Sequence, residues 1–391
     1  MRKYNLLLII MSYLKIFFLM LCMTLVSCTG QKTRKENDNN DKVGIEVGEI
    51  KFPPQNVLQL KSYYLSSSVH VDSTDYLIGY NYRSHSLDYM NIKSRSVTQI
   101  VLPGDGPDAI VRLSGIYVQS LDSVWISDES ERVFMVDSVG MIKRTIDLKK
   151  YLEDQEQLLI NTNYAMFTSH LFYNSSRRSL MFLVKNIASD TFLVKEVFID
   201  KDGKMATYQL SSSKVVPDMS KGYAYINFPN VNFVGEDIVY NYPVESSIYV
   251  LNIRTNERKY ILADSHYTSN IIKKCTTVGD YATLEKHWLE NPHFYDVMYL
   301  PKYKIYARLH ADKVDFDEKK GMEKLINERD LYLMLFDENM EKICEVKLSN
   351  YRYSPFTGWN ATYSGLALFV DNFLDEKNNT DDLTIDIISP K

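Results

Sequence analysis

One short stretch concentrates the side chains that could carry chemistry. It runs from His287 to His293 and holds two histidines and one glutamate at three-residue spacing, which on a helix would put possible metal ligands on one side. Pro292 interrupts such a helix, and the order of the residues differs from the His-Glu-x-x-His pattern of zinc hydrolases. We therefore interpret the stretch as a polar strand that leads into the next repeat. We predict no metal site, no cofactor and no catalytic residue here.

A second set of residue types suits recognition of a ligand. Arg308 ends an apolar, strand-like run that contains Tyr306, and arginine beside aromatic rings fits a carboxylate or a sugar ring. The candidate ligand-binding residues are Trp288, Asn291, His293, Tyr306, Arg308 and Trp359. Two alternatives stay open: Arg308 forms a structural ion pair between repeats, and Trp359 packs between the last repeat and the first.

Other motifs that carry chemistry are missing from the sequence. It has no Gly-x-Ser-x-Gly elbow, no phosphate-binding glycine loop and no dinucleotide fingerprint. The segment 104–108, Gly-Asp-Gly-Pro-Asp, has the composition of a cation loop but fits better as a turn between two repeats. The chemistry of the chain therefore gives no reaction.

The composition indicates which elements must position these residues. The chain has 391 residues, 45% of them hydrophobic, with only 15 Gly, 11 Pro and 4 Cys, which excludes a disordered, collagen-like or disulfide-scaffold protein. With 29 Tyr and 17 Phe, aromatic residues reach 13%, and aromatic side chains favour strands. We expect an all-β protein.

A repeated unit of three strands separated by polar turns starts after residue 43. The clearest copy has strands at 123–128, 132–137 and 141–148. The other copies have strands at 76–80, 86–92 and 96–102; 180–184, 192–200 and 205–210; 237–241, 248–253 and 258–262; 304–308, 331–337 and 342–348; and 366–371 with 383–388.

Six units of this size predict a six-bladed β-propeller. The last unit lacks an outer strand, and the alternating segment 44–52 precedes the first, so we expect this N-terminal strand to close the ring. Helical periodicity predicts decorations at 148–159 and 322–326. A β-sandwich pair or an irregular α+β domain is the alternative architecture.

The N-terminus predicts export. Arg2, Lys3 and Lys15 flank an eleven-residue apolar run at 16–26, the length of a signal-peptide core and too short for a membrane-spanning helix. The residues at 25–28, Leu-Val-Ser-Cys, match a bacterial lipobox. We predict a lipoprotein signal peptide at 1–27, a flexible tether at 28–42 that starts from lipidated Cys28, and a propeller at 43–391; an ordinary signal peptide is the alternative. Thr at position 29 favours the outer membrane.

Charge and cysteine usage narrow the partners. Loss of residues 1–27 removes three basic residues and no acidic one, which leaves 42 basic against 50 acidic residues and a formal charge of −8. Such a surface argues against nucleic acid as a partner. Cys275 and Cys344 would remain in the folded part without C-x-x-C spacing, and two buried thiols is the simpler expectation, with a disulfide as the alternative.

The segment 290–308 carries a family resemblance. Asn291 to Phe294 matches an Asn-Pro-x-aromatic motif, 299–301 a Tyr-Asp-Pro turn with Leu300 in place of Asp, and 306–308 an aromatic-Arg strand end with Ala307 in place of a second Tyr. With the lipobox and the repeats, the chain resembles the six-bladed, TolB-like propeller lipoproteins grouped as domain of unknown function 4221. The resemblance implies the fold and the envelope address, and implies no reaction.

Together these features predict a lipoprotein of the cell envelope, anchored to the outer membrane and facing the periplasm or the surface, whose propeller binds a ligand, a glycan or an envelope protein without catalysis. The alternative is a propeller enzyme, a glycan lyase or hydrolase, with acid and base residues at the central channel. Several carboxylates around a histidine in the channel would favour the enzyme. A channel with apolar and neutral walls would favour binding.

Overall fold

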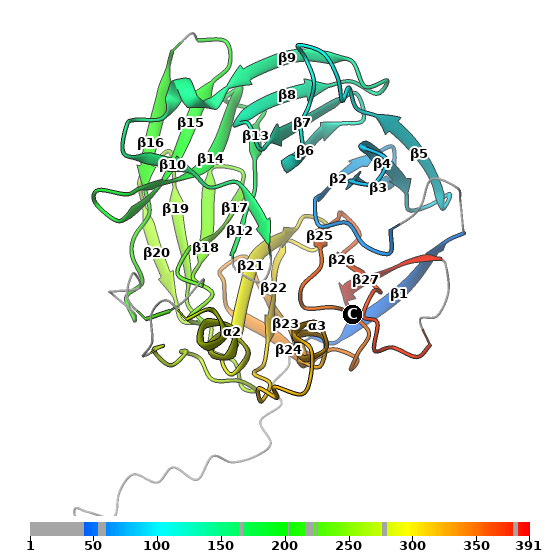
Figure 1. Ribbon diagram of the computed structural model, residues 1–391, viewed down its shortest axis with the longest axis vertical. Helices are drawn as coiled ribbons and strands as arrows, with labels where there is room; N and C mark the ends of the chain where they lie inside the picture. The colour runs from blue at the N-terminus through cyan, green and yellow to red at the C-terminus, as the bar shows by residue number, and fades with distance from the viewer. Residues whose placement is uncertain are drawn as a thin grey trace, which may run out of the picture. The chain divides into compact units, whose positions relative to one another are not determined.

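The computed structural model describes residues 43–53, 60–163, 167–201, 203–215, 222–223, 226–275, 280–377 and 382–391. The predicted signal peptide, tether and Cys28 lie outside these ranges. Six sheets surround one axis as the blades of a propeller, as predicted, and they are antiparallel except for one parallel pairing near the axis (Figure 1). Within the described ranges, no helix has the length and apolar character needed to cross a bilayer.

The first two blades are regular four-stranded sheets, numbered outward from the axis. Blade 1 holds β2 (Ser66–Val71), β3 (Thr74–Asn81), β4 (Ser86–Asn91) and β5 (Ser96–Val101); blade 2 holds β6 (Leu113–Ser120), β7 (Ser123–Asp128), β8 (Arg132–Val136) and β9 (Ile142–Asp147). Asp72 and Ser73 join β2 to β3 with φ of 48° and 60°, the backbone of a type I′ hairpin turn.

Blades 3 and 4 each have additional strands. Blade 3 is β13 (Phe172–Asn174), β14 (Ser179–Asn186), β15 (Thr191–Phe198) and β16 (Met205–Gln209), with β10 (Glu156–Leu158) paired to the end of β14. Blade 4 is β17 (Asn230–Val234), β18 (Asp237–Asn241), β19 (Ile248–Asn252) and β20 (Arg258–Ile261), extended inward by β12 (Phe167–Ser169) and β11 (Asn161–Asn163).

Blades 5 and 6 complete the ring. Blade 5 is β21 (His293–Leu300), β22 (Ile305–Ala311), β23 (Leu331–Phe336) and β24 (Lys342–Lys347); blade 6 is β25 (Trp359–Ala361), β26 (Leu366–Phe369), β27 (Leu383–Pro390) and β1 (Ile45–Phe52). β1 pairs with β27 along its full length, from Ile45 opposite Pro390 to Phe52 opposite Leu383. The N-terminal strand is therefore the outer strand of the last blade, where the sequence analysis put it (Figure 1).

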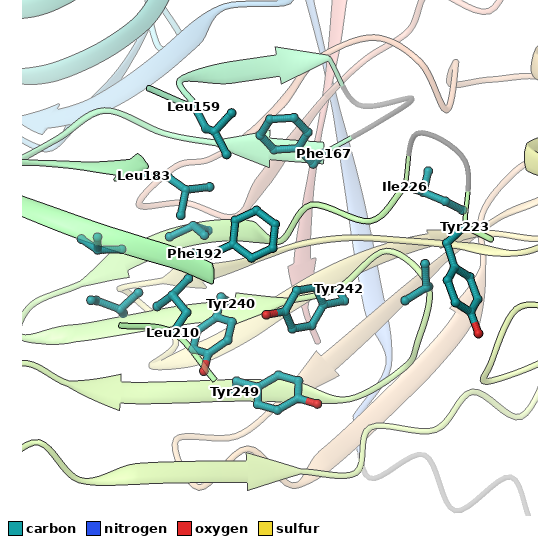
Figure 2. Close-up of a cluster of buried hydrophobic side chains, with 14 of the residues drawn as sticks. Leu159, Phe167, Leu183, Phe192, Leu210, Tyr223, Ile226, Tyr240, Tyr242 and Tyr249 are labelled. Carbon is teal, nitrogen blue, oxygen red and sulfur yellow. The ribbon is translucent and has the colours of Figure 1, made fainter. Parts of the chain in front are cut away.

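Apolar side chains fill the spaces between blades. Figure 2 shows the cluster around blades 3 and 4, in which Leu159 and Phe167 face Phe192. The rings of Tyr240 and Tyr249 stack in the same cluster, with centroids 5.1 Å apart and an angle of 18°. Much of the tyrosine content is thus blade packing. Cys275 and Cys344 are buried thiols, the simpler of the two expectations.

Of the two predicted helices one is correct and one is wrong, and the structure has a further helix where extended chain was predicted. α3 (Met322–Asn327) lies where the periodicity at 322–326 put it. The segment 148–159 forms only the 3-10 turn η1 (Leu148–Tyr151) before β10, because Lys195 donates to the Tyr151 carbonyl oxygen at 2.8 Å and pairs with Glu156 of β10. These tertiary contacts override the local helical pattern.

Conversely, His287 and Trp288, predicted in extended chain, lie in α2 (Tyr281–Leu289). The helix starts at Asp280, whose carboxylate accepts from the Thr283 amide at 3.2 Å. The helix ends at Glu290, two residues before Pro292. The proline therefore stops the helix as expected, but only after His287, which lies inside it.

Candidate functional site

Arg308 lies at the junction between blades 4 and 5 and has no exposed surface. Its guanidinium donates to the carbonyl oxygens of Ser246 and, at 2.8 Å, of Ala263, and packs over the rings of Phe294 and Phe336. Burial lowers the pKa of Arg308 to about 9, although nearby carboxylates oppose the shift. The arginine thus holds blade 4 to blade 5 through main-chain carbonyls, a structural role close to the ion pair considered above.

The residues around α2 are also buried and engaged. Asn291 accepts from the Lys273 amide at 2.9 Å and donates to the His287 carbonyl oxygen at 2.7 Å. The Trp288 indole N–H points at His293 Nδ1 at 3.3 Å. Burial, and to a smaller extent the charge of Arg329, holds the pKa of His293 well below its usual range, so this imidazole is neutral.

The same junction contains a serine, a histidine and a glutamate that the sequence analysis did not single out. Ser265 Oγ lies 3.1 Å from His310 Nε2 and 2.5 Å from Glu345 Oε1. A catalytic triad needs the acid on the other imidazole nitrogen. Here Glu345 also faces Nε2, at 3.6 Å, and all three side chains are at most 2% exposed. The cluster joins blades 4 and 5, and its geometry does not activate Ser265 as a nucleophile.

The two remaining predicted residues are Tyr306, on β22 like Arg308, and Trp359. Tyr306 is buried against Tyr299, with ring centroids 5.0 Å apart. Trp359 starts β25, the inner strand of blade 6, and lines a cavity in the central channel. Of the six predicted residues, the structure therefore brings only Trp359 to the channel; the other five do not line this cavity and, as ligand-binding residues, stay a prediction.

A hairpin of β11 and β12 links blade 4 to blade 2 along the inner side of blade 3. β12 pairs with β17 of blade 4, and β11 contacts β6 of blade 2, which is not a neighbour of blade 4. Asn230 anchors the hairpin, because its side chain accepts from the Thr168 amide at 2.7 Å and donates to the Phe294 carbonyl oxygen at 2.9 Å. The hairpin is therefore fixed to the inner strands of blades 4 and 5.

Glycine at position 115 makes room where this link to blade 2 begins. A Cβ on Gly115 would lie 2.6 Å from Ile160, just before the hairpin, and 2.6 Å from Ser127 Oγ. Any larger residue would push the chain at Ile160 away from blade 2.

The central channel contains a cavity of about 350 Å³, which we call the channel mouth. Inner strands of all six blades contribute to it. The lining residues are Ser66, Ser67, Ser68, Ile116, Tyr117, His170, Leu171, Phe172, Asn232, Phe233, Val234, Gly235, Met298, Tyr299, Pro301, Trp359, Asn360 and Ala361. The volume is at the lower end of the range for small-molecule sites.

Aromatic rings form one wall of the channel mouth. Phe172 and Phe233 stack at 5.1 Å with an angle of 15°, and Tyr117 meets Phe172 edge-on at 5.1 Å. These rings come from blades 2, 3 and 4, and Tyr299 and Trp359 come from blades 5 and 6. The mouth thus offers ring faces for stacking.

The polar groups of the mouth are mostly uncharged. Asn232 accepts from the Phe233 amide through Oδ1 at 3.0 Å, and within the described ranges no group accepts from its Nδ2. Asn360 donates to the Ser66 carbonyl oxygen at 2.8 Å. A half-buried asparagine amide with spare donors can hold a ligand hydroxyl or carbonyl.

His170 is the single titratable side chain other than tyrosine among these lining residues. Its Nε2 lies 3.1 Å from Oδ2 of Asp296, whose other oxygen accepts from the Trp359 indole at 3.2 Å. A β-bulge between Phe294 and Val297 turns Asp296 toward the axis. Asp296 is only 1% exposed, so it connects blades 3, 5 and 6 and does not reach the mouth itself.

Among the described residues, the walls of this cavity are apolar or neutral apart from His170. Glycoside hydrolysis needs two carboxyl groups that flank the substrate, and none of the lining residues is Asp, Glu, Lys or Arg. A lyase acting on a uronate also needs a cation or strong donors near the substrate carboxylate. Apolar and neutral walls are the kind that the sequence analysis associated with binding, and the function itself stays a prediction.

The sequence analysis missed most of the mouth because it did not recognise the inner strands. β13, β17 and β25 are three to five residues long, too short for a clear alternation of side chains. A usable signal existed: each recognised three-strand copy needs a fourth strand directly before it. In blade 3 the strand at that position contains the aromatic residue Phe172, and in blade 4 it contains the pair Asn232–Phe233.

Solved structures with the same fold are known. A member of the DUF4221 family from Bacteroides vulgatus superposes with a TM-score of 0.66 at 12% identity, over 90% of this chain and 99% of that one. An exported-protein candidate from Bacteroides fragilis gives a TM-score of 0.54 at 12% identity, over 91% of this chain and 98% of that one. At such identity the likeness shows the propeller fold alone. No curated protein matches the chain.

The family model for "Domain of unknown function (DUF4221)" matches residues 36–347, which include most of the propeller. The resemblance inferred from the segment 290–308 and the repeats is confirmed, and the chain belongs to the DUF4221 family.

Proposed function

We propose that this protein is a binding propeller of the cell envelope that holds an uncharged ligand in its channel mouth and makes or breaks no bond. The observation that carries the proposal is the lining of the mouth: five aromatic rings, amides and hydroxyls from all six blades, with His170 as the only imidazole. Binding sites of this kind combine apolar walls with a few polar groups that fix orientation.

The chemistry of the walls favours a ligand with a ring and several hydrogen-bonding groups. The faces of Phe172 and Phe233 can stack on the apolar face of a sugar, and Asn232 can pair with its hydroxyls. The absence of charged residues among the lining residues disfavours an anionic or cationic ligand, because burying an unpaired charge is costly. A single neutral sugar ring at the end of a glycan is the chemical class that fits best.

Calorimetric titration with methyl glycosides of glucose, galactose, mannose and N-acetylglucosamine tests this proposal. We expect at least one to bind, and Asn232→Ala to weaken it about tenfold, equal to ~1.4 kcal/mol. Asn339→Ala is the matched control, because Asn339 lies in the exposed turn between β23 and β24. Binding that is unaffected by Asn232→Ala, or no binding by any glycoside, would contradict the proposal.

The enzyme alternative has one observation in its favour, the His170–Asp296 pair next to the mouth. An imidazole oriented by a carboxylate is a general base in many enzymes. Incubation of the protein with neutral and uronic-acid oligosaccharides, followed by chromatography, should give no product. Product formation that is lost in His170→Gln would replace binding by catalysis as the function.

The envelope address is part of the same proposal. It is supported by the lipobox at 25–28 and by the similarity in fold to the exported-protein candidate. Lipid at Cys28 would supply the membrane anchor. Each methylene buried in the bilayer contributes about 0.8 kcal/mol of binding free energy, so several acyl chains together form a stable anchor. Growth with radiolabelled palmitate should label the wild-type protein, whereas Cys28→Ser should be unlabelled and leave the membrane fraction. A labelled Cys28→Ser protein would refute the anchor.

A further inference from the structure

A second cavity, of about 580 Å³, lies between blades 1 and 2 and shares no residue with the channel mouth. It is located where the chain enters β2 and β6, whereas the mouth includes the carboxyl-terminal ends of β17 and β21. The mouth also includes Ser66, Ser67 and Ser68 at the start of β2, so the two cavities follow one another along the inner strands and are lined by different residues. We call this second cavity the blade 1–2 cleft.

Four of the ten residues that line the cleft are aromatic: Tyr64, Tyr80, Tyr82 and Phe356. Tyr64 and Tyr82 are 43% and 51% exposed, which is unusual for large rings that face a cavity. Tyr64 meets Phe356 edge-on at 6.4 Å. Among the described residues, neither the Tyr64 nor the Tyr82 hydroxyl has a hydrogen-bond partner. The cleft therefore presents ring faces that the protein itself leaves uncovered.

Carboxylates outnumber cations around these rings. Glu129 lines the cleft, and the Tyr64 hydroxyl also lies in the field of Asp371 and Glu323. Arg112 is the one cation among the lining residues, and it pairs with Glu129 at 3.5 Å. Both partners of this pair are more than half exposed, so the pair is weak and Glu129 can exchange it for another partner.

We propose that the blade 1–2 cleft binds an organic ammonium group, held against the faces of Tyr64, Tyr82 and Phe356 and paired with Glu129. Aromatic faces attract cations through the ring quadrupole, and quaternary ammonium groups are bound in this way by rings that surround them. The Glu129 carboxylate supplies the negative charge that pairs with the ammonium group. This site is independent of the neutral ligand proposed for the channel mouth.

Choline and its uncharged isostere 3,3-dimethyl-1-butanol are the probes, because they share a shape and differ in charge. Calorimetric titration of the full-length protein should show choline binding at least tenfold tighter than the isostere. Equal affinities, or no choline binding, would overturn the proposal. Phosphocholine forms a further arm: tighter binding than choline that is lost in Arg112→Gln would identify a zwitterionic headgroup as the source of the ammonium, and weaker binding would identify a free ammonium compound.

Variants of the cleft make the test specific. Glu129→Gln should weaken choline about fivefold or more and leave the isostere unchanged. Arg112→Gln should strengthen choline, because it removes the competitor for Glu129; a cleft for an anion or for a sugar would lose affinity instead. Tyr82→Ala should weaken choline about tenfold, and Tyr281→Ala, an exposed tyrosine on α2 outside both cavities, is its matched control.

Two results separate this proposal from the proposed function. Asn232→Ala should leave choline binding unchanged, and Glu129→Gln should leave methyl glycoside binding unchanged. Choline binding that depends on Asn232 rather than on Glu129 and Tyr82 would place the ammonium in the channel mouth and overturn the assignment of the cleft.

Discussion

The junction between blades 4 and 5 and the channel mouth contain similar residue types but use them differently. At the junction, Arg308 donates to two carbonyl oxygens of blade 4, and His310 lies between the rings of Phe294 and Tyr332. At the mouth, Asn232 keeps spare donors and the aromatic rings line a cavity. The first region is occupied by its own protein, and the second can accept a ligand.

The difference shows that residue type alone does not identify a site. Arginine, histidine and tryptophan near one another suggest recognition, yet buried polar groups are normally satisfied by the protein itself. Arg308 Nε and His310 Nδ1 at the junction also have no hydrogen-bond partner among the described residues but are buried, so partial exposure of the spare donors is what distinguishes the mouth. If the distinction holds, substitutions at the junction should lower the free energy of unfolding, and substitutions at the mouth should weaken ligand binding.

Arg308→Met should have the largest effect. The change leaves the Ser246 and Ala263 carbonyl oxygens without their donor in a fully buried position, and we expect a loss of about 3 kcal/mol in the free energy of unfolding. Urea unfolding measures it, with Arg254→Met, an exposed arginine of blade 4, as the control. A variant that keeps its stability and loses methyl glycoside binding would instead make Arg308 a ligand residue, as the sequence suggested.

Trp359→Phe should have a mixed and smaller effect, because Trp359 belongs to both structure and mouth. Loss of the indole N–H takes one donor from Asp296, at a cost of about 1 kcal/mol in stability. The remaining ring still lines the mouth, so ligand affinity should fall only a few-fold. Thermal unfolding and calorimetric titration measure the two effects. A large loss of binding at unchanged stability would mean that the indole N–H contacts the ligand.

Glu245→Gln should change the pH dependence of stability more than its magnitude. Burial raises the pKa of Glu245 from its ordinary value of 4.5, against hydrogen bonds from Ser213, Tyr249 and Ser247. A raised pKa in the folded state contributes stability below pH 4.5, and this contribution is lost as the pH rises through the folded pKa.

The variant lacks this titration. Its stability relative to the wild type should therefore improve as the pH rises above 4.5, as urea unfolding at several pH values would show. A stability difference that is constant over that range would mean that Glu245 is already ionised at acidic pH.

The sequence predicted the fold well because the outer strands of each blade are long and separated by clear turns. In the first unit the expected 86–92 and 96–102 correspond to β4 (Ser86–Asn91) and β5 (Ser96–Val101). The missing outer strand of the last unit led directly to 44–52, and β1 pairs with β27 there. Periodicity and strand counting are global features, and they survive local errors such as the helix expected at 148–159.

The site was harder to predict because it depends on contacts across the ring. His170 meets Asp296 although 126 residues separate them in the chain. Asp296 faces the axis because of a bulge in β21, which nothing in the sequence around it signals. Trp359 lies at the mouth because it follows Gly358, whose position directly against the Tyr63 carbonyl oxygen brings the chain close to blade 1, and its part in ligand binding stays a prediction.

Tryptophan fluorescence tests the central claim most directly, because the chain has three tryptophans and only Trp359 lines the mouth. Trp125→Phe/Trp288→Phe leaves Trp359 as the reporter, and Trp125→Phe/Trp359→Phe leaves Trp288 at the junction. Titration with the methyl glycosides should change the emission of the Trp359 protein, and the dissociation constant from this change should equal the calorimetric one. The emission of the Trp288 protein should stay unchanged. A response from Trp288 and none from Trp359 would contradict the account.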